Sequence, residues 1–527
     1  MGRGKELVYY NGNLKGEYLS DRDCEILDNI IKLSEENGCI SDLKHIIYDI
    51  PNDDVKKIID TKSSEFIEKP LGTLEDQQTV GVGYMFFSKR CVLGDSVGLG
   101  KTVEVCGLCN LIAQHKAKLG VDFKFLYLTE KTLLMEAREK FVRFTGEYVD
   151  LLLGEKKYVK NFALENESEL KYSVVGAHSL INSVDFQEYL RTYKALYGVN
   201  PFDALFIDES AIIGNTATKT YDNARKLAED FDWVVVMNAT PFDTNLRTFY
   251  AQLNFCDETL LPTKTVFEKL YEVRQYMPHL GYSKFSGKYK NQHIFKSQVR
   301  YRYLARTRKS IGSVMRDCTA DLIVTPLTPV QKELLKRSSM PQMVYDCPSY
   351  FDSMIDTDSY TTPKIGAMMD LIKGKLKNES SIIIYSRYKE SQKGILKALL
   401  LEGISCEVMN GDTSIEDKNK IITKFKLGDI RVLVTNVQKG LDFGHCNNCI
   451  FYSYDPNPNK MVQFEGRMTR SKDIVGKHVY LLVSEGNELK RLREVVKNRA
   501  EASDVFAGSD FSCVLNLLLE NNIVNSK

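Results

Sequence analysis

A glycine-rich stretch, GDSVGLGKT at residues 94–102, constrains the fold of this chain more than any other feature. It follows an apolar run, Cys91 to Leu93, and it precedes a segment of helical character that ends near Lys116. A strand, a glycine turn and the start of a helix form the geometry that cradles phosphate groups. The sequence therefore predicts a phosphate-binding loop between a strand and a helix.

The residues of this loop have separate backbone and side-chain roles. Gly98 and Gly100 let backbone N–H groups approach phosphate oxygens, because glycine has no Cβ. Lys101 is expected to reach the β- and γ-phosphates of ATP, and Thr102 is expected to ligate Mg²⁺. Asp95 stands where the usual motif has its first glycine. The predicted ATP-contacting residues of the loop are Asp95, Ser96, Val97, Gly98, Leu99, Gly100, Lys101 and Thr102.

A second segment, DALFIDES at residues 203–210, ends a short apolar run with two adjacent carboxylates. A buried parallel strand of this kind delivers acidic side chains to the carboxyl edge of a sheet. Asp208 suits the Mg²⁺ shell, and Glu209 suits orienting and deprotonating the attacking water. Two adjacent acidic residues at the end of a strand, taken alone, are more often solvent-exposed side chains without a catalytic role. The phosphate loop upstream favours the catalytic interpretation.

Apolar strands alternate with helical stretches in two parts of the chain, from about residue 74 to 239 and from 381 to 483. This alternation is typical of parallel sheets covered by helices, so we expect an α/β fold with two similar lobes. The predicted domains are an N-terminal accessory region at 1–71, an ATP-binding lobe at 72–247, a basic inter-lobe insertion at 248–325, a second lobe at 326–486 and a C-terminal helical tail at 487–527.

Composition excludes several classes of protein. The chain has 71 basic and 70 acidic residues, so its net charge implies no polyanionic partner and any nucleic-acid surface must be local. No apolar stretch approaches the roughly 20 residues that span a bilayer, and the twelve cysteines show no secreted-type spacing. We expect a cytoplasmic protein without membrane contact. Two cysteine pairs, Cys106 with Cys109 and Cys446 with Cys449, are expected to pack in cores rather than to bind zinc.

The region between the two lobes concentrates positive charge. No Asp or Glu occurs from Val273 through Arg316, whereas eleven basic residues and several aromatic residues do. Such a stretch suits contacts with nucleic-acid phosphates, and Lys284, Lys288 and Lys290 are candidates for them. The alternative is that RYRYLARTRK, at residues 300–309, forms a brace helix whose arginines pair with acids elsewhere.

Successive segments of the chain resemble the motifs of superfamily-two helicases, and among these the Swi/Snf-type translocase branch. The resemblance extends from about residue 72 to residue 486. It rests on QTVG at 78–81, GDSVGLGKT, LYLTEKTLLMEAREKF at 126–141, FIDES, MNATPFDTNLRTFYAQLNF at 237–255, IIIYSRYKE at 382–390, VLVTNVQKGLDF at 432–443 and QFEGRMTRS at 463–471.

This resemblance implies two RecA-like lobes and further site residues. Gln78 is similar to the glutamine that recognises adenine, and Asp442 and Gln463 are expected to contact ATP. Arg467 and Arg470 resemble the arginines that enter the ATP site from the second lobe. Their guanidinium groups would stabilise charge on the γ-phosphate in the transition state. Loop positions expected to grip nucleic acid are Thr129, Lys131, Ser179, Arg387, Thr435 and Lys439.

The implied function is that of an ATP-dependent motor, most simply a double-stranded DNA translocase or helicase that remodels DNA or protein–DNA complexes. Two departures keep alternatives open. Ala211 follows FIDES where many relatives have histidine, so one hydrogen-bond link between the ATP site and the nucleic-acid site is expected to be absent or replaced. The GLD at 440–442 is similar to RNA-acting relatives, which favours an RNA helicase. A catalytically silent nucleic-acid-binding scaffold is the third alternative. We expect a monomer that uses ATP and Mg²⁺, with residues 1–71 available to a protein partner.

Overall fold

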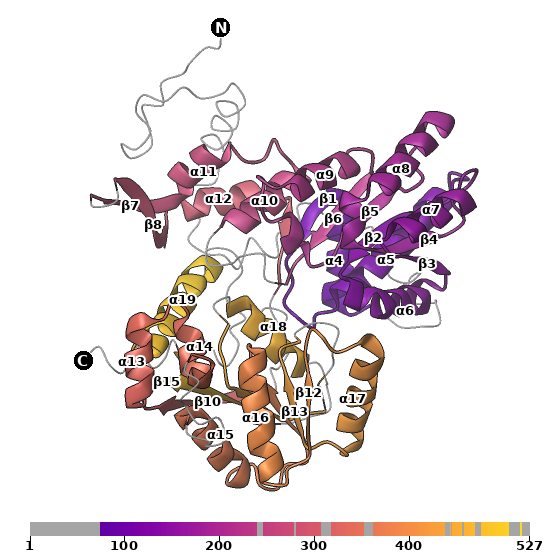
Figure 1. Ribbon diagram of the computed structural model, residues 1–527. Coiled ribbons are helices and arrows are strands. Elements are labelled where there is room, and N and C mark those ends of the chain that lie inside the picture. The colour runs from indigo at the N-terminus through magenta and orange to yellow at the C-terminus, as the bar shows by residue number, and fades with distance from the viewer. Residues whose placement is uncertain are drawn as a thin grey trace. The chain divides into compact units, whose positions relative to one another are not determined.

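The computed structural model describes residues 74–239, 246–278, 281–306, 318–351, 362–437, 443, 445–455, 458–468, 476–504 and 517–518. The accessory region predicted at residues 1–71 lies outside these residues. The chain divides into two compact units, and the described residues 74–306 fall in the first and 318–499 in the second. Figure 1 shows the elements of each unit.

The first unit is built on a seven-stranded parallel sheet in the order β3-β4-β2-β5-β6-β1-β9. Every side chain of β2, β4, β5 and β6 is buried, as expected for strands covered on both faces. The strands are β1 Arg90–Leu93, β2 Phe125–Thr129, β3 Val149–Leu152, β4 Ser173–Ala177, β5 Ala204–Ile207, β6 Trp233–Met237 and β9 Tyr303–Leu304.

Helices cover both faces of this sheet. Successive strand residues point to opposite sides, so apolar strands present two apolar faces that helices bury. Val92 packs on the side of α7 to α12, whereas Cys91 and Leu93 pack on the side of α4 to α6. The helices are α4 Asp76–Ser88, α5 Lys101–Ala117, α6 Leu134–Thr145, α7 Lys156–Glu165, α8 Val184–Tyr197, α9 Lys219–Ala228, α10 Arg247–Cys256, α11 Lys264–Tyr271 and α12 Gln292–Val299. Short 3₁₀ turns lie at η1 Lys131–Leu133, η2 His178–Asn182 and η3 Ser210–Ile213.

The second unit has a six-stranded parallel sheet in the order β10-β15-β14-β11-β13-β12. Its strands are β10 Cys318–Thr325, β11 Ile382–Tyr385, β12 Cys406–Met409, β13 Val432–Thr435, β14 Asn448–Phe451 and β15 Lys477–Ser484. Its helices are α13 Pro329–Arg337, α14 Pro341–Asp346, α15 Pro363–Lys373, α16 Lys389–Leu401, α17 Ile415–Leu427, α18 Pro458–Met468 and α19 Asn487–Asp504, with a 3₁₀ turn at η4 Pro348–Tyr350. The predicted α/β fold with two parallel sheets is confirmed.

The predicted separate insertion at residues 248–325 is wrong in its boundaries. Residues 303–304 form β9, which pairs with β1 at the edge of the first sheet, and residues 318–325 form β10 in the second sheet. The alternative of a brace helix within 300–309 is not confirmed, since Tyr303 and Leu304 are a strand. The pairing of arginines with acids that it expected is found, because Arg302 pairs with Asp257 and Arg306 pairs with Asp95 and Glu104. Apolar side chains of α10, α11 and α12, within 249–271 and 294–299, are buried in the core of the first unit, so these helices extend that unit. Neither β3, β9 nor β10 was predicted.

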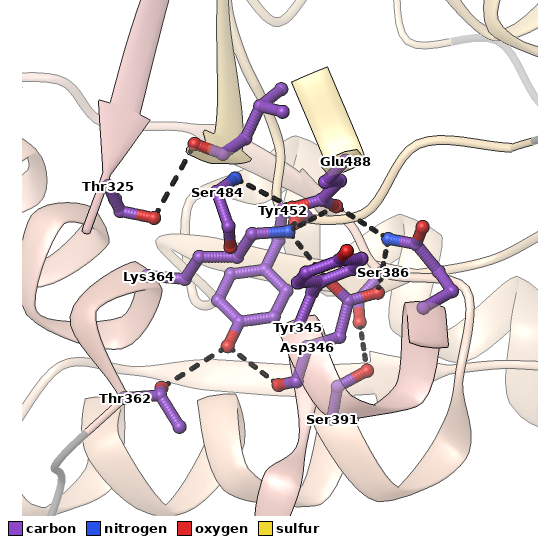
Figure 2. Close-up of polar contacts among 12 residues, drawn as sticks. Thr325, Tyr345, Asp346, Thr362, Lys364, Ser386, Ser391, Tyr452, Ser484 and Glu488 are labelled. Carbon is purple, nitrogen blue, oxygen red and sulfur yellow. Dashed lines mark hydrogen bonds and ion pairs between the residues drawn. The ribbon is translucent and has the colours of Figure 1, made fainter. Parts of the chain in front are cut away.

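A buried ion cluster joins several elements of the second unit. The Nζ of Lys364, a residue 1% exposed, donates to Asp346 Oδ1 at 2.7 Å and to Glu488 Oε1 at 2.8 Å. Figure 2 shows these contacts, together with the bond from the backbone N of Ser484 to Glu488 Oε2 at 2.6 Å. Burial alone would lower the pKa of Lys364, but the two carboxylates outweigh it and raise that pKa. The cluster therefore fastens α14, α15 and α19 together.

The Tyr452 hydroxyl completes this cluster and allows a stability prediction. It donates to the backbone carbonyl of Asp346 at 2.9 Å in a fully buried position (Figure 2). Tyr452→Phe should lower the free energy of unfolding by about 1–2 kcal/mol, because the carbonyl loses its donor in the interior. Urea denaturation measures the change, with Tyr350→Phe as the control. The Tyr350 side chain is 57% exposed, so its substitution should stay within about 0.5 kcal/mol. Equal losses in both variants would contradict the prediction.

The two cysteine pairs lie in hydrophobic cores. Cys106 and Cys109 are buried on α5, and Cys446 and Cys449 are buried in the second unit, where the Cys446 thiol donates to the carbonyl of Ser381 at 3.3 Å. Burial raises the pKa of the Cys446 thiol. The prediction of core packing is therefore confirmed. Among the helices that the structure describes, none combines the length and the apolar character that a bilayer crossing requires.

Candidate ATP site

The phosphate loop lies between β1 and α5 and has the backbone that its glycines predict. Gly98 and Gly100 have φ of 87° and 89°, a left-handed conformation that side chains disfavour. A Cβ on Gly100 would also collide with the amide of Gln78. Lys101 and Thr102 begin α5, so the first backbone N–H groups of this helix lie at the loop, where they suit an anion.

The Lys101 side chain turns back onto the loop. Its Nζ donates to the carbonyl of Asp95 at 2.6 Å and to that of Ser96 at 3.4 Å. Burial lowers the pKa of Lys101, and the carboxylates of Asp95 and Asp208 offset part of this effect. The ammonium group is thus held in the loop by weak neutral acceptors, which phosphate oxygens can replace.

Tyr127 connects the two predicted halves of the site. This residue lies on β2, and its buried hydroxyl donates to Asp208 Oδ2 at 2.9 Å and also interacts with the side chain of Thr102. Burial, and then the Asp208 carboxylate, raises the pKa of Tyr127 well above its usual value. The structure therefore brings Thr102 and Asp208, the two predicted Mg²⁺ ligands, to one hydroxyl, and their role as ligands stays a prediction. Tyr127 itself was missed.

The conformation after β5 presents Glu209. This residue has φ of 49°, which is left-handed and costly for a residue with a side chain. Its backbone N–H donates to Asp208 Oδ1 at 2.9 Å, a bond that orients the Asp208 carboxylate. The left-handed turn thus places two consecutive acids, Asp208 and Glu209, directly after β5, and their predicted roles toward a metal ion and water stay predictions.

Arg306 fills the interior beside the loop. Its side chain is 2% exposed, and its Nε donates to Asp95 Oδ2 at 3.0 Å while its Nη2 donates to Glu104 Oε2 at 2.7 Å. The backbone N–H of Arg306 donates to Asp95 Oδ1 at 2.9 Å, and the carbonyl of Arg306 accepts from Ser96 N at 3.0 Å. The Asp95 carboxylate therefore supports the loop from inside the protein, and any contact of Asp95 with ATP would have to come from its backbone.

Gln78 ties α4 to the same loop. Its Nε2 donates to the carbonyl of Leu99 at 3.1 Å, and its Oε1 accepts from the backbone N of Glu75 at 3.0 Å. The side chain is nearly buried at 8% exposed. Its predicted role in adenine recognition stays a prediction.

The remaining ATP-site candidates belong to the second unit. Gln463 is half-buried on α18, and Arg467 lies on the same helix. Asp442, Arg470 and the side chain of Arg467 lie outside the described residues. The roles of these four residues therefore stay predictions.

The predicted nucleic-acid contacts differ in exposure. Lys131 is 58% exposed and pairs with Glu155 at 2.6 Å, and Ser179 is exposed after β4, the strand beside β2. Thr129 and Thr435 are fully buried at the ends of the interior strands β2 and β13, so their side chains offer no exposed surface, and their predicted contacts with nucleic acid stay predictions.

The other residues predicted to contact nucleic acid differ in their position and exposure. Arg387 is half-buried, with its guanidinium 5.2 Å from the ring centre of Tyr388. Lys439 lies outside the described residues. Lys284 and the exposed Lys288 lie on β8 Tyr282–Tyr289, which pairs with β7 Glu272–Met277, and the half-buried Lys290 follows β8 directly.

His178 is a further residue that the sequence did not single out. It begins the turn after β4, and its Nε2 lies 2.7 Å from the backbone carbonyl of Asp208. The ring thus connects the acidic turn with the loop that carries Ser179. The resemblance predicted that a histidine link could be missing because Ala211 follows the acids. His178 supplies a contact to the same turn from another strand, which only the tertiary structure could reveal.

Comparison with known proteins decides the family. A model described as the SNF2-related domain matches residues 32–392, which is more than half of the chain. The chain belongs to this family. A second model, described as the helicase conserved C-terminal domain, matches residues 363–472. The predicted Swi/Snf-type membership and the predicted class of ATP hydrolase are confirmed.

Individual relatives of this SNF2-related chain are distant. It is 22% identical over 431 residues to the uncharacterized ATP-dependent helicase YqhH of Bacillus subtilis (strain 168), which covers 74% of this chain and 71% of that protein. It is 18% identical over 462 residues to the DNA repair and recombination protein RAD54B of Gallus gallus, covering 75% of this chain but only 49% of that protein. The chain thus spans about half the length of the latter relative.

Two solved structures are similar over most of the chain. The Sulfolobus solfataricus SWI2/SNF2 ATPase core in complex with dsDNA matches with 17% identity and a TM-score of 0.37, covering 82% of this chain and 94% of that one. The Pyrococcus furiosus Hef helicase domain matches with 14% identity and a TM-score of 0.45, covering 81% and 97%.

Proposed function

We propose that this SNF2-related chain is an ATP-dependent motor that translocates along double-stranded DNA and remodels DNA or protein–DNA complexes. The observation that carries the proposal is the convergence of Thr102 and Asp208 on the Tyr127 hydroxyl, beside Lys101. This convergence joins a phosphate loop to an acidic turn that includes Glu209.

Each side chain of this site has a distinct task in ATP hydrolysis. The loop N–H groups and the first turn of α5 bind phosphate oxygens, and Lys101 exchanges its loop carbonyls for the β- and γ-phosphates. Glu209 orients the attacking water and accepts its proton. Thr102 and Asp208 offer a hydroxyl and a carboxylate, which are the hard oxygen ligands that Mg²⁺ prefers. Bound there, the ion would neutralise charge on the phosphates.

The alternatives are less well supported. The matching family model is the SNF2-related one, so an RNA helicase is not favoured despite the GLD at 440–442. A silent scaffold would not need Lys101, Asp208 and Glu209 together. The monomeric state, the cytoplasmic location, the protein partner of residues 1–71 and the arginine roles of Arg467 and Arg470 stay predictions.

ATP hydrolysis in the presence of different polymers tests the proposal. We expect duplex DNA to stimulate hydrolysis more than single-stranded DNA or RNA, since only a duplex is the proposed track. Displacement of a third strand from a DNA triplex would measure translocation directly. Selective stimulation by RNA would replace the DNA proposal, and stimulation by no polymer would favour the scaffold.

A further inference from the structure

A two-stranded ribbon extends from the helical part of the first unit. Strands β7 and β8 pair only with each other among the described strands, in antiparallel register with Arg274 opposite Phe285 and Tyr276 opposite Ser283. Figure 1 shows the ribbon beyond α11 and α12, away from the parallel sheet of its unit. It is therefore an appendage that the ATP site does not need for its own geometry.

Both faces of the ribbon are exposed. Tyr276 on β7 is 60% exposed and Tyr282 on β8 is 54% exposed, and Val273, Arg274 and Gln275 are exposed as well. A two-stranded ribbon of this kind has little stability of its own in water. Its exposed aromatic side chains thus have no packing role within the described residues that explains them.

The base of the ribbon is nevertheless held firmly. The backbone N of Lys290 donates to the carbonyl of Tyr271 at 2.9 Å, and Asn291 Nδ2 donates to the carbonyl of Leu270 at 2.9 Å. The rings of Tyr271 and Phe295 pack with their centres 4.8 Å apart between α11 and α12. These contacts fix the direction in which the ribbon leaves the unit.

The charge of the ribbon is one-sided. Its only acid is Glu272 at the base, which is 1% exposed and interacts with Arg274 at 3.2 Å. Arg274 is thus already paired, whereas Lys288 is exposed and has no acidic partner among the residues that the structure describes. Glu272 pairs with Tyr289, whereas Arg274 pairs with Phe285, so residues 286–288 of β8 form a bulge opposite a single residue of β7. Such bulges change the direction of nearby side chains.

We propose that the β7–β8 ribbon inserts into the major groove of duplex DNA and makes the motor prefer B-form DNA to duplex RNA. This inference rests on the proposed function. The B-DNA major groove, about 12 Å wide, admits a two-stranded ribbon, whereas the deep and narrow major groove of an RNA duplex does not. The exposed Lys288 then meets a phosphate, and the exposed tyrosines lie against the groove. Lys284, the other lysine of β8, is the second candidate from its place in the sequence.

The test uses the full chain and the double variant Lys284→Glu with Lys288→Glu. The matched control is Lys118→Glu with Lys171→Glu, the same charge change on exposed residues that precede β2 and β4. These controls lie at the amino edge of the sheet, opposite the phosphate loop. Neither ribbon lysine belongs to the ATP site, so ATP hydrolysis without DNA should stay unchanged in both double variants.

Equilibrium binding to a duplex DNA and to a duplex RNA of equal length is the first readout. For the ribbon variant, the slope of log K against log salt on DNA should decrease in magnitude by roughly 2, because two phosphate contacts are lost. DNA binding at low salt should weaken by roughly tenfold, and the control should change neither value. The wild-type protein should bind the RNA duplex less tightly than the DNA duplex.

Dimethyl sulfate footprinting is the second readout, since it methylates guanine N7 in the major groove. The unchanged protein and the control should protect N7 positions that the ribbon variant leaves reactive. An unchanged salt slope, equal binding of DNA and RNA, or missing N7 protection overturns the ribbon proposal even when duplex DNA stimulates hydrolysis. A ribbon that instead docks a protein gives this same outcome. Absence of any duplex binding overturns the ribbon proposal and the proposed function together.

Discussion

Glu209→Gln is expected to bind ATP with nearly normal affinity but to hydrolyse it about 10²- to 10⁴-fold more slowly, because the amide cannot accept the proton of the attacking water. The substitution keeps the size of the side chain in its left-handed backbone position, so folding should be preserved. Lys101→Ala should instead abolish productive binding, since the loop loses the cation that reaches the phosphates. Single-turnover hydrolysis and equilibrium nucleotide binding separate the two effects.

The control for this pair is Glu188→Gln on α8. Glu188 is 66% exposed and pairs with Arg191 within the same helix, so its loss should leave both binding and hydrolysis unchanged. Normal turnover by Glu209→Gln would show that another group is the base. Normal ATP binding by Lys101→Ala would show that the helix N-terminus alone holds the phosphates.

Arg306→Met should lower the free energy of unfolding by about 3–5 kcal/mol, because two buried carboxylates, Asp95 and Glu104, lose their shared cation. Burial, and then the Asp95 charge, already raises the pKa of Glu104 well above its usual value. A carboxyl whose folded pKa is raised loses stability as pH rises through that pKa. The deficit of the variant should therefore be larger at about pH 8 than at about pH 5.5. Chemical denaturation at both pH values measures it.

Two further variants make the Arg306 prediction specific. Arg302→Met removes an arginine four positions earlier whose pair with Asp257 is partly exposed, so it should cost only about 1 kcal/mol. Combining Arg306→Met with Asp95→Asn and Glu104→Gln removes all three charges of this buried cluster. The triple variant should therefore recover much of the lost free energy of unfolding. If Arg306→Met costs no more than Arg302→Met, the buried cluster does not support the loop as inferred.

Local sequence was sufficient for the elements that carry the chemistry. The run into Gly94, the turn through Gly100 and the helix from Lys101 all lie where the sequence predicts them, because strand, turn and helix are adjacent in the chain. The same holds for β5 with Asp208 and for most strands of both sheets. The order of the motifs along the chain can also be read from the sequence, and this order predicted the family.

Contacts between distant segments could not be predicted in this way. Asp95 and Arg306 are 211 residues apart, and the basic stretch around Arg306 fits a nucleic-acid surface as well as a buried brace. The structure divides that stretch, since Arg302 and Arg306 pair with acids while Lys288 on the ribbon before them is exposed. A basic stretch that binds nucleic acid and one that pairs with buried acids have the same charge composition. Only the burial of the side chains distinguishes the two.

The sequence by itself therefore determined the phosphate loop, the acidic turn, the alternation of strands and helices, and through them the SNF2-related family. Only the tertiary structure decided that Tyr127 joins Thr102 to Asp208, that His178 meets the acidic turn, that Thr129 and Thr435 are hidden, and that residues 303–304 complete the first sheet. The physical reason is that glycine turns and apolar periodicity act within a few residues, whereas burial and the pairing of charges depend on chain segments that folding alone brings together.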